Sequence, residues 1–143
     1  MIARRSLFIL WSLVFFLACC AGAFMVHRHI VNRHEREAAA LAAYQDIYTR
    51  LASGDLESVL ARMPDSVPER PAHLREMRWW IQEKSLSPAS VVAVRVEGSR
   101  AEIQFPADPD GVGWALTLES GHAGWWPHSV GLWATKEHMD LID

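Results

Sequence analysis

Histidine is the residue type in this chain whose spacing first suggests chemistry. His27 and His29 lie two residues apart, whereas ligand pairs on a helix prefer a spacing of three or four residues. His122 and His128 flank a turn, and His138 lies near the C-terminal end. These spacings match no zinc signature, and both cysteines lie within the apolar N-terminal stretch. We therefore expect no metal site.

Motifs of covalent catalysis and of phosphate binding are missing from the sequence. There is no Ser-His-Asp spacing, glycine-rich phosphate loop or paired-carboxylate motif. The chain has 17 Asp and Glu residues against 14 Lys and Arg residues, a balance that does not suit nucleic-acid binding. We expect no catalytic residues and no cofactor, which favours a protein that is not an enzyme.

Tryptophan is the unusual residue, with seven in 143 positions. Trp79 and Trp80 are adjacent, as are Trp125 and Trp126, and neighbouring side chains on a strand face opposite sides of a sheet. Trp125 and Trp133 then share the face opposite Trp126. That face is covered by a dimer partner or a cavity, or it is an aromatic patch for a protein partner or the bilayer interface.

The elements that must position these residues begin with an apolar stretch from Ser6 to Val26. It carries no charged side chain, and at about 1.5 Å per residue a helix of this length spans about 31 Å, the thickness of a bilayer core. Apolar residues continue past Ala23, which favours an uncleaved membrane anchor. Two alternatives are a signal peptide cleaved after Ala21-Gly22-Ala23 and a lipoprotein acylated at Cys19 or Cys20.

The flanks of the stretch bear on its orientation. The short N-terminal tail holds Arg4 and Arg5, and the other flank holds Arg28, Arg33 and Arg36, so the positive-inside count nearly cancels. A short basic tail before one apolar segment is typical of a signal anchor. We expect a single-pass protein of a bacterial inner membrane with its domain on the periplasmic side.

The rest of the chain predicts helices followed by strands. The apolar period is that of a helix up to Ser53, in Leu56–Arg62 and from Pro71 to Lys84, and from Ser90 it changes to two. Gly54 suits a helix C-terminus, and Asp55 suits the N-cap of the next helix. The fold class is therefore α+β: an N-terminal transmembrane helix, then three helices packed on a four-stranded antiparallel meander sheet. The expected divisions are a basic tail (1–5), the transmembrane helix (6–26), a juxtamembrane helical collar (27–37), the α+β domain (38–134) and a C-terminal tail (135–143).

Two segments resemble the NTF2-like (cystatin-like, cone-shaped) superfamily. One is YQDIYTRLASGDLESVL, from Tyr44 to Leu60, and the other runs from Val112 to Val130 through Gly124-Trp125. The family usually has a short strand between its second and third helices, where this chain offers only Pro64–Pro68. The resemblance implies a sheet curled around a pocket, in which some members are isomerases and many others bind ligands or partners.

For isomerase chemistry the resemblance asks for a buried acid or imidazole near a hydroxyl. Tyr44 and Tyr48 share a helix face, whereas Asp46 points elsewhere, toward solvent. His128 lies among apolar residues, where a lone histidine is more often a hydrogen-bonded core residue than a catalyst. The residues expected to line a pocket or contact a partner are Tyr44, Tyr48, Trp79, Trp125, Trp126, His128 and Trp133.

Taken together, these patterns predict a membrane-anchored, non-catalytic accessory or protein-binding subunit of a bacterial membrane complex. Its expected partners are the lipid bilayer and another protein or a second copy of the chain. One alternative is an anchored small-molecule-binding or isomerase-like protein that uses a cone pocket. The other is a secreted periplasmic protein released by signal cleavage.

Overall fold

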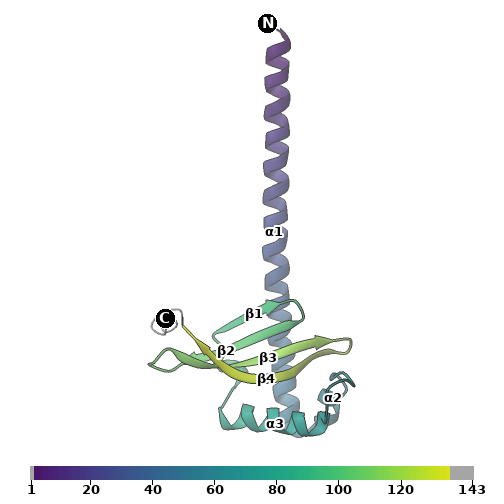
Figure 1. Cartoon of the computed structure of the whole chain (residues 1–143), viewed down its shortest axis with the longest axis vertical. Coiled ribbons are helices and arrows are strands. Elements are labelled where there is room, and N and C mark those ends of the chain that lie inside the picture. Colours follow the sequence, from purple (N-terminus) through teal and green to yellow (C-terminus); the bar gives the residue numbers. More distant parts are fainter. Residues whose placement is uncertain (1, 136–143) are drawn as a thin grey trace. The chain divides into compact units, whose positions relative to one another are not determined.

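The computed structural model describes residues 2–135, with side chains from residue 9 to residue 135. The chain is α+β, as predicted, with its helices before its strands (Figure 1). The predicted C-terminal tail lies outside the described residues from residue 136 onward, as does His138. The elements are α1 (Ile2–Ser53), α2 (Leu56–Leu60), α3 (Arg70–Glu83), a 3₁₀ turn (Pro88–Ser90), β1 (Ala93–Glu97), β2 (Arg100–Ala107), β3 (Val112–Gly121) and β4 (Gly124–Ala134).

Helix α1 combines three segments that the sequence pattern separates. The apolar stretch, the polar collar and the first helix of the domain are one continuous helix, so residues 2–135 contain three α-helices and not an anchor followed by three more. The reason is that this segment holds no proline and one glycine, Gly22, while residues 38–43 are strong helix formers. Nothing in the local sequence ends the helix before Gly54.

The chain divides into two compact units, Met1–Glu35 and Arg36–Asp143. In the first unit, the part of α1 from Ile9 onward includes a stretch long and apolar enough to cross a membrane, and none of that stretch is buried. Large apolar side chains such as Trp11 and Phe15 are exposed. A membrane anchor and a signal sequence both have these properties.

The end of α1 and the start of α2 are determined by local chemistry. Gly54 has a φ of +84°, and the N–H groups of Gly54 and Asp55 donate to the carbonyls of Leu51 and Arg50, which is the Schellman pattern. The Asp55 carboxylate then accepts from the N–H of Ser58 and so caps α2. Both predictions for Gly54 and Asp55 are confirmed.

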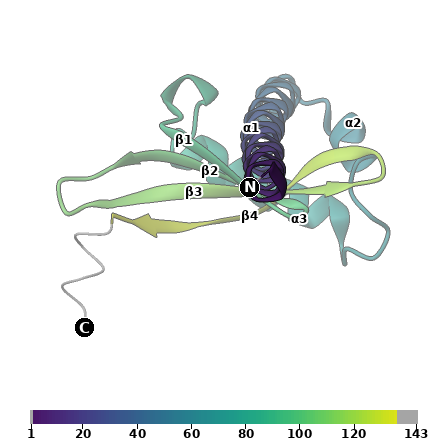
Figure 2. The same ribbon diagram turned by 90° about the horizontal axis from the view of Figure 1, so that it is seen from above.

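The sheet is an antiparallel meander in the order β1-β2-β3-β4, as predicted. Figure 2 shows β1 and β4 at its two edges. One face packs against α3 and the last turns of α1. The opposite face carries polar side chains in register, such as Arg95, Glu102 and Thr117. An edge contact adds to this packing, since the guanidinium of Arg36 donates to the carbonyl of Gly98 in the β1–β2 turn.

The space between the helices and the sheet is filled by side chains. Leu116 and Trp126 are buried there, and Trp114 packs against the same cluster. The other buried members include Ala40, Tyr44, Ile47, Leu51, Val59, Leu74, Ile81, Leu86, Ile103, Phe105 and Leu118. The core side of the sheet is therefore a packed layer.

Two irregularities in the sheet change where side chains point. The register of β3 with β4 pairs Thr117 with Ser129 and Leu118 with Pro127, so His128 is an extra, bulged residue. The strict alternation predicted for the strands does not anticipate this bulge. It also separates Trp125 from Trp133, which pair with Ser120 and Gly113 of β3 and so lie on opposite faces of the sheet, not on one face as predicted. Residues 61–69 form turns and no strand, so the short strand that many NTF2-like proteins place there is not formed in this segment.

Candidate functional site

An aromatic cluster on α3 and β3 presents an exposed tryptophan at the surface of the second unit. Trp79 is 53% exposed, and its ring centroid lies 4.9 Å from that of Trp80. Trp80 in turn lies 5.6 Å from Trp114 of β3. The ammonium of Lys84 lies 5.0 Å from the Trp114 centroid and 5.7 Å from that of Trp80. We call Trp79, Trp80, Lys84 and Trp114 the tryptophan patch.

The way the C-terminal end of α3 is held explains why these rings meet. Ser85 has a φ of +51°, and the N–H groups of Ser85 and Leu86 donate to the carbonyls of Gln82 and Ile81, a second Schellman pattern. The buried hydroxyl of Tyr44 then donates to the Leu86 carbonyl and holds the end of α3 on α1. Trp80 is thereby placed over the sheet, while Trp79, about 100° further round the helix, faces outward.

The patch can bind an apolar surface. Its indole rings are partly desolvated already by one another, and a cation over two rings adds an attraction for a carboxylate at the rim. Leu132 extends the apolar area, because it pairs with Trp114 in the sheet register and is 65% exposed. Contiguous exposed groups of this kind mark contact surfaces for proteins or membranes.

Tyr44 and Tyr48 share a helix face that packs toward the core, and Tyr44 is closed off from solvent. Tyr44 is fully buried, with its ring edge-on to Phe105 at 6.0 Å and to Tyr48 at 6.3 Å. Burial, and to a smaller extent Tyr48, raises the pKa of the Tyr44 phenol above its ordinary value. Its hydroxyl is occupied by the Leu86 carbonyl, so Tyr44 supports the fold and is not placed to donate a proton to a ligand.

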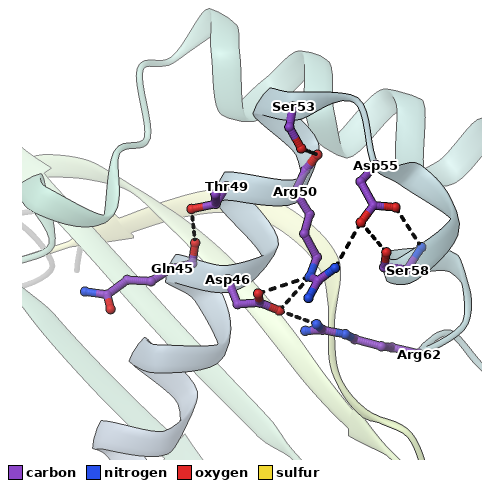
Figure 3. Close-up of polar contacts among 8 residues, drawn as sticks. All are labelled: Gln45, Asp46, Thr49, Arg50, Ser53, Asp55, Ser58 and Arg62. Atoms are coloured by element: carbon purple, nitrogen blue, oxygen red, sulfur yellow. Dashed lines mark hydrogen bonds and ion pairs between the residues drawn. The ribbon is translucent and has the colours of Figure 1, made fainter.

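Asp46 belongs to an ion-pair network at the surface, shown in Figure 3. Arg50 donates to both carboxylate oxygens of Asp46 at 3.0 Å, and Arg62 donates to one of them. Arg50 also donates to Asp55 at 2.9 Å. Hydrogen bonds from Arg62 and Arg50 lower the pKa of Asp46, the opposite of what a general base working near neutral pH requires. The network ties α1 to α2.

A groove of about 450 Å³ lies between the loop after α2 and the β3–β4 hairpin. Its lining includes Pro64, residues 66–68, His73, Glu119, Trp126 and His128. His73 Nε2 is hydrogen-bonded to the Pro127 carbonyl at 3.1 Å, which fixes that ring.

The polar pair in the groove is close but poorly aligned. Glu119 Oε2 lies 3.2 Å from His128 Nδ1, within ion-pair distance, yet that nitrogen has no hydrogen bond with good geometry among the described residues. The Nε1 of Trp126 is also buried without a partner in the described part of the chain. The groove can hold a small molecule against Trp126 with a donor group toward Glu119.

The remaining predicted tryptophans have structural roles. Trp126 is buried in the core, and Trp125 packs partly buried against the same cluster. Trp133 is also partly buried, and its Nε1 donates to the Phe105 carbonyl at 3.0 Å. In the sheet register it pairs with Gly113 of β3. Of the four predicted tryptophans, Trp79 has the ring most open to a partner.

The structure brings together residues that sequence reasoning did not select. Lys84 and Trp114 join Trp79 and Trp80 although they come from different elements, and His73 and Glu119 join His128. The contact of Lys84 with Trp80 did have a signal in the sequence, because residues four positions apart are neighbours on a helix. No local signal links His73 to His128, because their proximity depends on the packing of α3 on β4.

Comparison with known proteins adds no relative. No protein-family model matches the chain, and neither a curated protein nor a solved structure matches it.

Proposed function

We propose that this protein is a membrane-anchored, non-catalytic accessory subunit whose domain binds another protein through the tryptophan patch. The observation that carries the proposal is the half-exposed Trp79 at the surface of a domain whose interior is packed. Its ring meets Trp80 edge to face, and Trp80 in turn lies against Trp114. A ring exposed in this way keeps apolar area in water that a partner would remove. Tryptophan is also one of the residue types enriched at the energetic centres of interfaces.

The geometry restricts the chemistry of the partner. Its contact surface is apolar where it meets Trp79, and it carries a carboxylate near Lys84, whose ammonium is held over two rings. The apolar stretch of α1 supports a partner within the same membrane, because an anchor confines both proteins to one surface and raises their effective concentration.

Site-specific photo-crosslinking of the full chain in its native membrane tests this proposal. A photoreactive phenylalanine analogue at Trp79 is expected to form a covalent adduct with one defined protein, identified by mass spectrometry. The same analogue at Val92, an equally exposed apolar residue before β1, is the matched control and is expected to form no such adduct. Lys84→Glu is expected to reduce the Trp79 adduct by about tenfold, equivalent to about 1.4 kcal/mol.

Three results would overturn the proposed function. These are equal adducts at positions 79 and 92, adducts with lipid only, and an adduct at position 79 that Lys84→Glu leaves unchanged. Adducts with lipid only would mean that the patch contacts the bilayer interface, where tryptophan is also enriched.

We also propose that the second unit is an NTF2-like domain. The support is the order of a long helix, a Gly-Asp turn into a short helix, a third helix and an antiparallel meander. Turns at residues 61–69 replace the usual short strand, and packed side chains fill the core side of the sheet. An experimental structure of the domain that superposes on known members of this superfamily would bear the assignment out, and one that does not would refute it.

The proposed location is a bacterial inner membrane, with one span and the domain on the periplasmic side. Both cysteines lie in the apolar stretch, so an engineered cysteine at Ser120, which is exposed, would be the reactive thiol of the domain. A membrane-impermeant maleimide is expected to label it in intact spheroplasts. Labelling only after lysis would place the domain in the cytoplasm.

The intact mass of the mature protein tests whether the apolar stretch is retained. A mass that corresponds to a chain beginning at Phe24 would show a cleaved signal and a free periplasmic protein.

A second candidate function, binding of a small molecule, is favoured by the groove beside Glu119 and His128. Glu119 would accept a hydrogen bond from a donor group of the ligand, while Trp126 would contact its apolar part. Mass spectrometry of metabolites that copurify with the full chain tests this alternative. It predicts a ligand retained by the wild type and lost from Glu119→Gln, and it fails if the two preparations carry the same metabolites.

A further inference from the structure

Strand β4 is the long edge of the sheet, and its two halves differ in protection. The other edge, β1, is short and carries the charged residues Arg95 and Glu97, which discourage pairing with another strand. The first half of β4 is covered, because Pro127 lacks an N–H, its carbonyl is bonded to His73, and His128 is bulged. The second half, Ser129–Ala134, has no charge, no proline and no bulge.

The ladder with β3 determines which backbone groups of this segment are open. The N–H of Thr135 donates to the carbonyl of Gly111 at 2.9 Å, so these residues form a hydrogen-bonded pair. In an antiparallel ladder such pairs alternate with pairs whose N–H and C=O groups point outward. The backbone groups of Val130, Leu132 and Ala134 therefore point away from β3, at an edge beside which no other strand of residues 2–135 lies.

We propose that two copies of this chain pair antiparallel through Ser129–Ala134 of β4, with the twofold axis at Leu132. The two sheets then become one continuous sheet. This register joins outward groups to outward groups, because Leu132 meets Leu132 of the second copy and Val130 meets Ala134. A twofold axis requires such self-complementarity, and this uncharged segment has it.

The side chains also fit this register. Leu132 is 65% exposed, and pairing removes it from water against its own copy. Trp133 falls opposite Gly131 of the second copy, a residue without a side chain, and the space around Gly131 is open in the single chain, where a Cβ on it would meet no atom within 4 Å. A strand of another protein would need to reproduce this pattern of small and large residues. The pairing would also place two tryptophan patches on one face of the combined sheet.

Disulfide trapping in the bilayer tests the pairing. The full chain with Cys19 and Cys20 changed to serine is reconstituted in lipid nanodiscs or vesicles, and Leu132→Cys is compared with Val92→Cys, an exposed apolar control. Facing Cα atoms in a hydrogen-bonded antiparallel pair lie about 5.5 Å apart, within disulfide range. Under mild oxidation, Leu132→Cys is expected to form a covalent dimer at least about tenfold faster than Val92→Cys.

A charge at the twofold axis provides a second test of the pairing. Leu132→Lys is tolerated by the fold because the position is exposed, but it puts two like charges at the twofold axis. The full chain is therefore expected to become monomeric while its circular dichroism is unchanged. Equal trapping rates for the two cysteine variants, or a Leu132→Lys protein that remains dimeric, would overturn the pairing. Trapping of Leu132→Cys to a different protein in native membranes would overturn it as well. The tryptophan-patch proposal fails separately, because its adduct at Trp79 does not depend on dimer formation.

Discussion

The indole of Trp133 lies directly over Gly113 and reaches past it to the Phe105 carbonyl. The register of β2 with β3 shifts between Gln104 and Ala107, and Pro106 in that interval has no N–H, so the Phe105 carbonyl lies where the ladder is interrupted. A donor from β4 satisfies it. The glycine is what lets the ring approach, since a Cβ there would lie 2.5 Å from Trp133 Nε1 and 2.9 Å from the Phe105 oxygen.

Gly113→Ala is therefore expected to destabilise the domain by about 1–3 kcal/mol, because one of the close atoms is backbone that cannot rotate away. Thermal unfolding of the full chain in detergent measures the change. Trp133→Phe in the alanine background removes the indole nitrogen, so the penalties of the two changes should be less than additive. Additive penalties would mean that Trp133 does not limit the space at residue 113.

Tyr44→Phe is expected to cost about 1–3 kcal/mol, because it leaves the buried Leu86 carbonyl without its donor. The control is Tyr48→Phe, which keeps that bond and is expected to cost less. Since burial raises the pKa of Tyr44, the folded state holds the phenol proton more tightly than the unfolded state does. The stability is full below the ordinary value of 10.0 and declines as the pH rises above it. Thermal unfolding of Tyr44→Phe measured at increasing alkaline pH should lack this decline in stability.

Asp46→Asn is expected to reduce the acid sensitivity of the domain. Hydrogen bonds from Arg62 and Arg50 lower the pKa of Asp46, so its contribution is present above the unfolded value of 3.8 and is lost as the pH falls through the folded value. Melting temperatures measured from neutral pH down to about pH 3 should fall less steeply for Asp46→Asn than for wild type. Glu83→Gln, an exposed change on α3, serves as the control and should follow the wild-type slope. A variant at Asp46 with that same slope would contradict the network.

The two left-handed helix ends predict changes of opposite sign. Gly54→Ala puts a Cβ at a φ of +84° and is expected to cost about 1 kcal/mol. Ser85→Gly relieves the same strain at a φ of +51° and is expected to stabilise by up to about 1 kcal/mol, a rise of about 4–8 °C in Tm. Melting curves of the two variants side by side provide the measurement. Shifts of the same sign would contradict the Schellman assignment at one of the helix ends.

Much of the architecture could be predicted because it depends on local chemistry. The apolar stretch, the glycine at the end of α1, the cap at Asp55 and the alternating strands each act over a few residues, and short connections then leave a meander as the simple arrangement. The same local rules predicted that Tyr44 and Tyr48 share a face. The continuity of α1 was harder to predict, since a change from apolar to polar composition is not a helix break.

Tertiary packing decided what the candidate residues do. Tyr44, Asp46 and Trp133 are all capable of binding or catalysis by type, yet their polar groups are used by the Leu86 carbonyl, by two arginines and by the Phe105 carbonyl. One bulged residue, His128, changed the alternation on β4. The sequence alone determined which elements form, because backbone preferences are local. Which aromatic rings are left open depended on contacts between residues far apart in the chain, such as Trp80 with Trp114, and no spacing in the sequence encodes those distances.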